Sequence, residues 1–203
     1  MTISREIFDI FEHHLLNDEK PSEYLNAEID REGFSYPFTM LKKLQDIPQS
    51  PEHHPEGNVW NHTLLVVDEA AKRKSESEDK RAFMWAALLH DIGKVVLNDY
   101  VRFGYSLIMK LIDEEKISFL DAEIQVLGFD HALVGSLLVE KWGLPEQYQY
   151  VAACHHTPDR LPDEVKQHQP LIDTVHLANS LCLMLGVGIG AEGLQYPLYP
   201  DVF

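Results

Sequence analysis

A histidine and an aspartate stand side by side in the stretch AALLHDIGKVV, which runs from Ala86 to Val96. Small and apolar residues precede His90 and Asp91, as in a helix that is buried in a core. Burying a polar group without a partner costs roughly 2–7 kcal/mol, so this doublet needs partners from elsewhere in the chain. Imidazole nitrogen and carboxylate oxygen together suit Zn, Mn, Fe and related divalent ions, which can activate water.

Further histidines stand at or near the ends of other expected helices, where side chains from several helices can meet. They are His62, His131, His155 and His156. Taken singly, each has an ordinary explanation: His62 as a core histidine, the doublet as a helix C-terminus with a capping aspartate, and the last pair as an exposed helix end. Only convergence of these side chains on one pocket would make a site. Other histidines are interpreted as surface groups (His13, His14, His168) or lie in a proline-rich loop (His53, His54).

Hydrophobic periodicity predicts helices almost throughout and no β-hairpin, so the expected fold class is all-α. The expected helices cover residues 4–16, 39–45, 59–74, 81–91, 103–115, 120–127, 132–142, 147–155 and 171–185, and residues 95–104 are expected to form a loop. Residues 47–58 contain three prolines and one glycine in twelve residues, which indicates a loop. We therefore expect an N-terminal helical extension over residues 1–50 and a main domain over residues 51–203.

The bulk composition limits the possible functions. The 203 residues include 17 Lys and Arg against 33 Asp and Glu, a formal charge of −16, which argues against general nucleic-acid binding. No apolar run is long enough to span a bilayer, and the N-terminus does not resemble a secretory signal or a transit peptide. Two cysteines form no disulfide framework, so we expect a reduced, cytoplasmic protein. The N-terminal helices could enlarge the core, cover the pocket or form a homodimer.

Four segments in this order, NHTLLVVDEA, ALLHDIGK, DHALVGSLLVEKWGLPE and CHH, resemble the HD superfamily of metal-dependent phosphohydrolases, specifically its HDIG form. The resemblance covers roughly Pro51 to Gly190 and implies an all-helical HD-domain bundle. It implies one or two divalent ions, from Fe, Mn, Zn, Ni, Co or Mg. The implied metal ligands are His62, His90, Asp91, His131, His155, His156 and the position of Asn179. Asp91 would bridge the ions, and Lys94 would lie at the pocket mouth and contact a substrate phosphate.

Two branches of the superfamily share different parts of the sequence. SPEHHPEGNVWNHTLLV is similar to the start of the HD domain in bacterial CCA-adding enzymes, whereas the segments from HALVGSLLVEKWGLPE to VHLANSL resemble the HDOD group, which is often regulatory. The last family ligand is usually an aspartate, and Asn179 stands there instead. Asparagine keeps a carbonyl oxygen that can bind a metal but carries no charge. His176, one turn before Asn179, is a candidate supporting residue.

Two functions remain open at this point. The first is a phosphohydrolase acting on a small phosphorylated substrate, such as a nucleotide, through a metal-activated water, with Asp91, Lys94 and His54 in catalytic roles. His54 would protonate the leaving group or contact phosphate. The second is an HDOD-like regulatory or scaffold module that keeps a vestigial or partial metal site. A structural zinc domain is disfavoured, because such sites use closely spaced ligands that are mostly cysteines.

Overall fold

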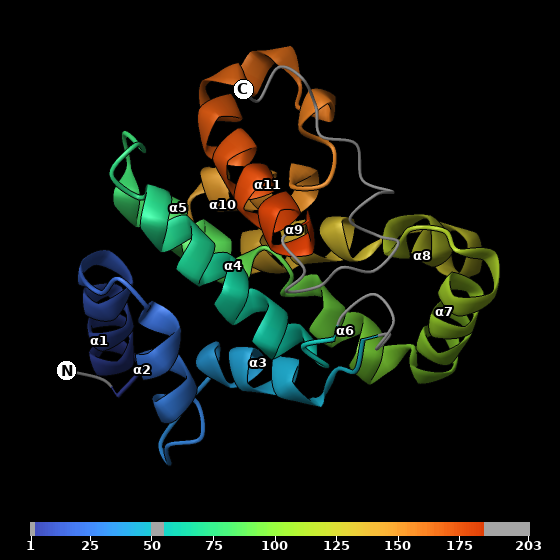
Figure 1. Cartoon of the computed structure of the whole chain (residues 1–203), viewed down its shortest axis with the longest axis horizontal. Coiled ribbons are helices and arrows are strands. Elements are labelled where there is room, and N and C mark those ends of the chain that lie inside the picture. The colour runs from blue at the N-terminus through green and yellow to red at the C-terminus, as the bar shows by residue number, and fades with distance from the viewer. Residues whose placement is uncertain (1–2, 50–54, 185–203) are drawn as a thin grey trace.

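The structure is a computed structural model that describes residues 3–49 and 55–184, and this part of the chain is built from helices with no strand (Figure 1). The helices are α1 (Ile3–Asn17), α2 (Pro21–Glu28), α3 (Phe38–Lys43), η1 (Leu44–Asp46), α4 (Val59–Arg73), α5 (Lys80–Leu89), α6 (Gly93–Tyr100), α7 (Arg102–Glu115), α8 (Phe119–Leu127), α9 (His131–Lys141), α10 (Glu146–Cys154), η2 (Pro158–Arg160), η3 (Asp163–His168) and α11 (Gln169–Met184). The expected all-α class is confirmed.

The expectation of a loop over residues 95–104 is wrong. Helix α6 begins at Gly93, and α7 follows it after a single residue, Val101. The segment GKVVLNDY was difficult to recognise because it begins with glycine and forms only about two turns. Its buried Val95 and Leu97 nevertheless hold it against the core. The chain therefore turns at residues 90–92, between two helices.

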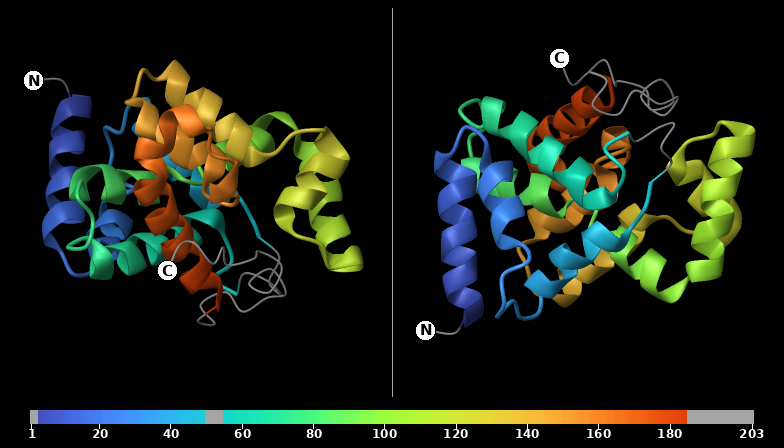
Figure 2. Two further views of the ribbon diagram at one scale, coloured as in Figure 1. Left: turned by 90° about the horizontal axis from the view of Figure 1, so that it is seen from above. Right: turned by 60° about the horizontal axis from the view of Figure 1, so that its bottom comes forward.

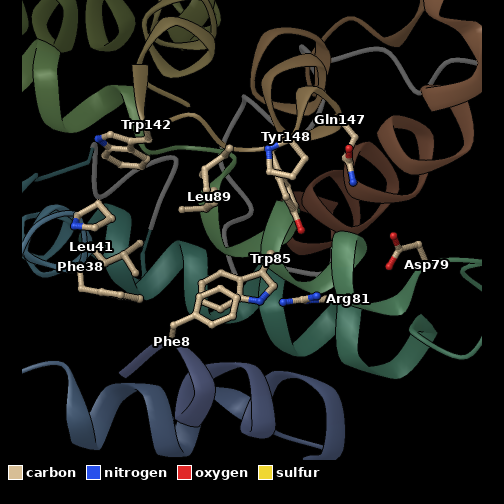
Figure 3. Close-up of a pocket in the computed structure, with 13 residues that line it drawn as sticks. Phe8, Phe38, Leu41, Asp79, Arg81, Trp85, Leu89, Trp142, Gln147 and Tyr148 are labelled. Atoms are coloured by element: carbon tan, nitrogen blue, oxygen red, sulfur yellow. The ribbon is translucent and has the colours of Figure 1, made fainter. Parts of the chain in front are cut away.

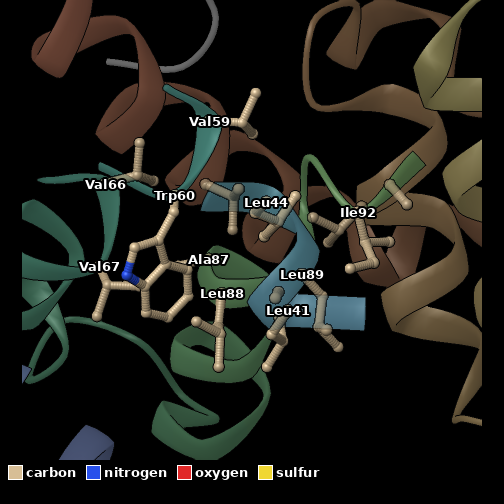
Figure 4. Close-up of a cluster of buried hydrophobic side chains, with 14 of the residues drawn as sticks. Leu41, Leu44, Val59, Trp60, Val66, Val67, Ala87, Leu88, Leu89 and Ile92 are labelled. Atoms are coloured by element: carbon tan, nitrogen blue, oxygen red, sulfur yellow. The ribbon is translucent and has the colours of Figure 1, made fainter. Parts of the chain in front are cut away.

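The core is centred on α4 and α5. Every residue of α5 from Ala82 to Leu89 is buried, and α1, α4, α10 and α11 all pack against this helix. Figure 4 shows Trp60 and Val67 of α4 beside Ala87 and Leu88 of α5. Burying a side chain of the size of leucine contributes roughly 1.5–3 kcal/mol, so a helix that is apolar on all sides is stable only at such a central position.

The N-terminal helices pack on this core. Phe11 and Leu15 of α1 and Leu25 of α2 are buried in the same hydrophobic cluster as α4 and α5. The Trp60 indole donates to Asn26 Oδ1 at 3.1 Å. Helices α7 and α8 pack against each other and stand to one side of the remaining helices (Figure 2).

Helix ends, rather than helix faces, are brought together at the centre of the molecule. Asn58 caps α4 and Asp130 caps α9, each through a side-chain oxygen that accepts a backbone N–H of the first turn. His62 therefore lies in the first turn of α4, and His131 is the first residue of α9. His90 directly follows α5, and His155 directly follows α10.

No single helix in the described ranges is both long and apolar enough to cross a bilayer. Helices α8 and α9, bent by 82° at their junction, meet that criterion only as a pair and only by length and composition.

Gly93 allows α6 to cross α9 at very short range. A Cβ atom at this position would lie 2.0 Å from the carbonyl oxygen of His131 and 2.6 Å from the amide nitrogen of Gly135. Both are backbone atoms, so neither can rotate away. The glycine after the His-Asp doublet thus determines how closely Asp91 can approach the start of α9.

We predict that Gly93→Ala destabilises the protein by about 3 kcal/mol, because the added methyl group forces the two helices apart. Gly135→Ala, on the other side of the same crossing, is the matched control. Its Cβ would meet its nearest atoms at 3.4 and 3.6 Å, and alanine favours the helix, so its effect should stay below about 1 kcal/mol. Urea unfolding followed by circular dichroism measures both, and equal stability of the two variants would contradict the prediction.

Candidate metal centre

Five histidines and Asp91 meet at the point where the helix ends converge. They form two groups, in each of which one ligand atom per residue lies within 4.8 Å of the others: Asp91 with His131, His155 and His156, and Asp91 with His62 and His90. All six side chains are buried, with exposed fractions of 7% or less. The structure thus brings together the histidines that the sequence analysis selected, and Asp91 belongs to both groups.

The two oxygens of Asp91 face different partners. Oδ1 lies 3.3 Å from His131 Nε2 and 3.7 Å from His155 Nε2. Oδ2 lies 3.5 Å from His90 Nε2 and accepts from Lys94 Nζ at 3.0 Å. Burial alone would raise the pKa of Asp91, but the nearby Lys94 and histidines outweigh it and hold the pKa well below the ordinary value. The side chain is therefore a carboxylate whose two ends point into two groups of histidines.

His90 and His155 are held in the same way. Each Nδ1 donates to the backbone carbonyl three residues earlier, at 2.8 Å to Ala87 and 3.0 Å to Ala152. Burial lowers the pKa of His90 to about 3 and also lowers the pKa of His155, so both rings are neutral. A neutral ring that donates from Nδ1 carries its lone pair on Nε2. Both Nε2 atoms consequently face the cluster in the form that binds metal.

His131 is held by a buried acid that the sequence analysis missed. Glu123, on α8 and fully buried, accepts from His131 Nδ1 at 2.6 Å and from its backbone N–H at 2.9 Å. Burial lowers the pKa of His131, but Glu123 outweighs it and raises the pKa to about 9. The opposite ring nitrogen, Nε2, lies 3.0 Å from Nε2 of His156, whose pKa burial holds well below its usual value. The available signal in the sequence was a glutamate inside the apolar helix FLDAEIQVL.

His62 lies between two oxygen atoms. Its Nδ1 is 3.1 Å from Glu56 Oε1, and its Nε2 is 2.9 Å from Asn179 Oδ1. An acceptor oxygen therefore lies at each ring nitrogen. A cation shared by Nε2 and the Asn179 oxygen would fit this arrangement, with Nδ1 donating to Glu56. Glu56 comes from the proline-rich loop and was also missed.

The donor set fits a divalent metal ion. Three buried atoms of the cluster, His90 Nε2, His155 Nε2 and Asp91 Oδ1, have no hydrogen-bond partner in the described part of the chain. Buried polar atoms are normally satisfied, and these three belong to the two groups that Asp91 connects. The neutral imidazoles of His90 and His155, a carboxylate and an amide oxygen are ligands for borderline divalent ions such as Zn, Mn, Fe, Co and Ni, whose binding to His131 would displace its Nε2 proton.

The remaining predicted site residues are placed as follows. Lys94 is 4% exposed, pairs with Asp91 and lies 4.9 Å from the centre of the Phe119 ring, so it belongs to the interior of the cluster and not to an open mouth. His176 Nδ1 donates to the His155 carbonyl at 2.7 Å and so supports the end of α10. His54 lies outside the described residues.

Comparisons with known proteins agree with this architecture. The family model of the HDOD domain matches residues 37–158. A crystal structure of an HDOD domain protein of unknown function from Geobacter sulfurreducens superposes with a TM-score of 0.62 at 23% identity, covering 92% of this chain and 78% of that one. At that identity the likeness concerns the fold alone.

Curated relatives match a shorter region. The multifunctional CCA protein of Actinobacillus pleuropneumoniae serotype 5b (strain L20) is 34% identical over 76 residues, which cover 37% of this chain and 18% of that protein. The multifunctional CCA protein of Hahella chejuensis is 28% identical over 121 residues, 56% of this chain and 28% of that one. The chain therefore covers less than a third of the length of either relative.

Replacing Glu123 by glutamine tests how His131 is oriented. The substitution removes the negative charge next to Nδ1 of His131. Glu123→Gln should therefore weaken Zn²⁺ or Co²⁺ binding by roughly 10- to 100-fold in calorimetric titrations. Glu140→Gln, the same change at an exposed position of α9, should leave the affinity unaltered. Equal affinities for wild type and Glu123→Gln would show that this carboxylate does not contribute to the site.

Proposed function

The chain belongs to the HDOD domain family, and on that premise we propose that it is a metal-dependent phosphohydrolase for a small phosphate ester, such as a nucleotide. The cluster would bind one or two divalent ions. The observation that carries the proposal is the position of Asp91, whose two oxygens face two separate groups of histidines. A carboxylate with two differently directed oxygens is suited to bridging two cations.

The proposed metal ligands form two sets that share Asp91. His90, Asp91 and His62, with the oxygen of Asn179, would hold one ion, and Asp91 with His131, His155 and His156 would hold the other. A divalent ion in such a site supplies Lewis-acid activation of a phosphate ester and of water. Glu56 and Glu123 keep two of the rings oriented through their Nδ1 atoms.

Two residues are assigned to the substrate in this proposal. The Lys94 ammonium lies 3.0 Å from the Asp91 carboxylate and supplies positive charge next to the ions, where a phosphate would bind. His54 is proposed to protonate the leaving group or to contact the phosphate. The formal charge of −16 favours a small phosphorylated molecule over a nucleic acid, because nucleic-acid binding depends on extended lysine and arginine surfaces.

A second function has a specific observation in its favour. Lys94 and all six side chains of the cluster are buried, with exposed fractions of 7% or less, and Asn179 takes the place of a carboxylate. A closed cluster with reduced charge also suits a regulatory or scaffold module, in which the ion stabilises the fold without turnover. The two functions share the metal and differ in hydrolysis.

Hydrolysis by metal-loaded protein distinguishes these functions. With Mn²⁺, Co²⁺, Ni²⁺ or Mg²⁺, the wild-type protein should hydrolyse at least one member of a panel of nucleotides, p-nitrophenyl phosphate and bis(p-nitrophenyl) phosphate. Asp91→Asn should lower kcat/KM by at least about 100-fold, or about 2.7 kcal/mol, because the shared anion is lost. Asp163→Asn, at an exposed position of η3, should behave like the wild type.

If protein that holds one or two ions per chain shows no turnover with any of these esters, the hydrolase proposal fails. The scaffold function then predicts that chelation lowers the Tm, because an ion bound only to the folded state stabilises it. A Tm that does not respond to chelation would contradict that function as well.

Restoring a carboxylate at position 179 tests the asymmetry of the site. Asn179→Asp is nearly isosteric and places a negative charge 2.9 Å from His62 Nε2. The ion proposed to be held by His62, His90 and Asp91 should therefore bind at least about tenfold more tightly, or by 1.4 kcal/mol. Gln125→Glu adds the same charge at an exposed position of α8 and should have no effect. Titration with Mn²⁺ followed by electron paramagnetic resonance measures the change, and an unaltered affinity would argue that position 179 is not a ligand.

A further inference from the structure

A cavity of about 300 Å³ lies away from the metal cluster, between α1, α3, α5 and the turn that joins α9 to α10 (Figure 3). None of the proposed metal ligands lines it. The known capacity of engineered cavities gives a scale, since about 150 Å³ is enough to hold benzene. This cavity is therefore large enough for a molecule with two fused rings.

The walls of the cavity are aromatic and held in place. The rings of Phe8 and Trp85 are stacked, with centroids 4.8 Å apart and planes 4° from parallel. The Trp85 indole donates to Glu12 Oε2 at 3.2 Å, and the Trp142 indole donates to the Tyr36 hydroxyl. Rings fixed by such bonds form a preformed slot for another flat ring, at little cost in side-chain entropy.

Polar groups are gathered where α10 meets α5. Figure 3 shows the Tyr148 hydroxyl directed toward Trp85 and Arg81. Neither this hydroxyl nor the Gln147 amide has a hydrogen-bond partner among the residues of the described ranges. Burial raises the pKa of Tyr148 to about 12, so the hydroxyl keeps its proton and can donate. The cavity thus combines an apolar lining with available donors at its α10 end, of which the Tyr148 hydroxyl is directed toward Trp85.

The charges around the cavity select against anions. The charged groups that face the Tyr148 hydroxyl are Asp79, Arg81 and Glu12. Arg81 is already paired, with its Nε 2.5 Å from Glu12 Oε2. One guanidinium against two carboxylates leaves a net negative charge, so a ligand carboxylate or phosphate would be repelled.

From these observations we infer that the cavity is a binding site for a small uncharged aromatic compound of two fused rings, whose hydrogen-bond acceptor meets the Tyr148 hydroxyl. The rings lie against Trp85, Phe8 and Trp142, and the acceptor points toward α10. This site is independent of the proposed phosphohydrolase activity, since it shares no residue with the metal cluster.

The test uses 2-naphthol as the probe, with the chain of 203 residues carrying ¹⁵N-labelled tryptophan. The three indole N–H signals report separately: Trp85 and Trp142 line the cavity, whereas Trp60 is 1% exposed and buried among α4 and α5. The expected result is saturable binding that shifts the Trp85 and Trp142 signals and leaves the Trp60 signal in place. The anion 2-naphthoate should bind at least about tenfold more weakly.

Two variants locate the probe. Tyr148→Phe keeps the ring and removes the hydroxyl, so it should weaken 2-naphthol by roughly three- to tenfold and leave naphthalene, which has no acceptor oxygen, unaffected. Leu144→Trp fills the cavity and should abolish both shifts. Leu137→Trp, at a 54% exposed position of α9, is the control and should bind the probe like the wild type.

The inference is overturned if the folded wild-type protein shows no saturable binding of 2-naphthol, or if 2-naphthoate binds equally well. Unchanged binding in Leu144→Trp would also overturn it, because the probe would then lie elsewhere. Sedimentation analysis without probe provides a further check. A dimer that dissociates in Leu144→Trp would identify this face as a contact between two copies and not as a small-molecule site.

Discussion

The carboxylate of Asp91 is a negative charge held inside the core, and the arrangement around it follows from that constraint. A buried charge without partners would cost several kcal/mol, and Asp91 is 2% exposed. Lys94 and the histidines supply the compensation, and they come from the end of α5, the first turn of α6, the start of α9 and the end of α10. The bundle is therefore organised so that helix ends meet. Gly93 makes this possible where α6 crosses α9, because a Cβ atom there would collide with the α9 backbone.

Buried carboxylates recur behind the histidines. The carboxylates of Glu56 and Glu123 lie next to Nδ1 of His62 and His131. Backbone carbonyls accept from Nδ1 of His90 and His155. In all four rings the Nε2 atom is left directed at the interior. A core that needed only packing would have no reason to turn four imidazoles the same way, and this common orientation supports the interpretation of the cluster as a metal site.

Much of this could be predicted from the sequence, and the exceptions have physical causes. The long helices have strong periodicity and appear close to where expected, and the histidines of the cluster are marked by their positions at helix ends. Helix α6 was missed because Gly93 at its start is typical of a turn. In the structure this glycine instead allows α6 to cross α9 at short range. Glu56 and Glu123 were missed because their role depends on contacts made across the fold, which periodicity does not report. Lys94 was expected at an open pocket mouth. Its burial depends on how α6 packs against its neighbours, which the sequence pattern does not report.

Anomalous X-ray diffraction from crystals of the protein loaded with Mn²⁺ or Zn²⁺ would show whether the cluster around Asp91 binds metal. We expect one or two anomalous peaks inside the cluster, each within about 2.0–2.3 Å of ligand atoms, with Asp91 contacting every ion present. An absence of peaks at the cluster, or peaks only at surface histidines such as His13 and His168, would contradict this expectation.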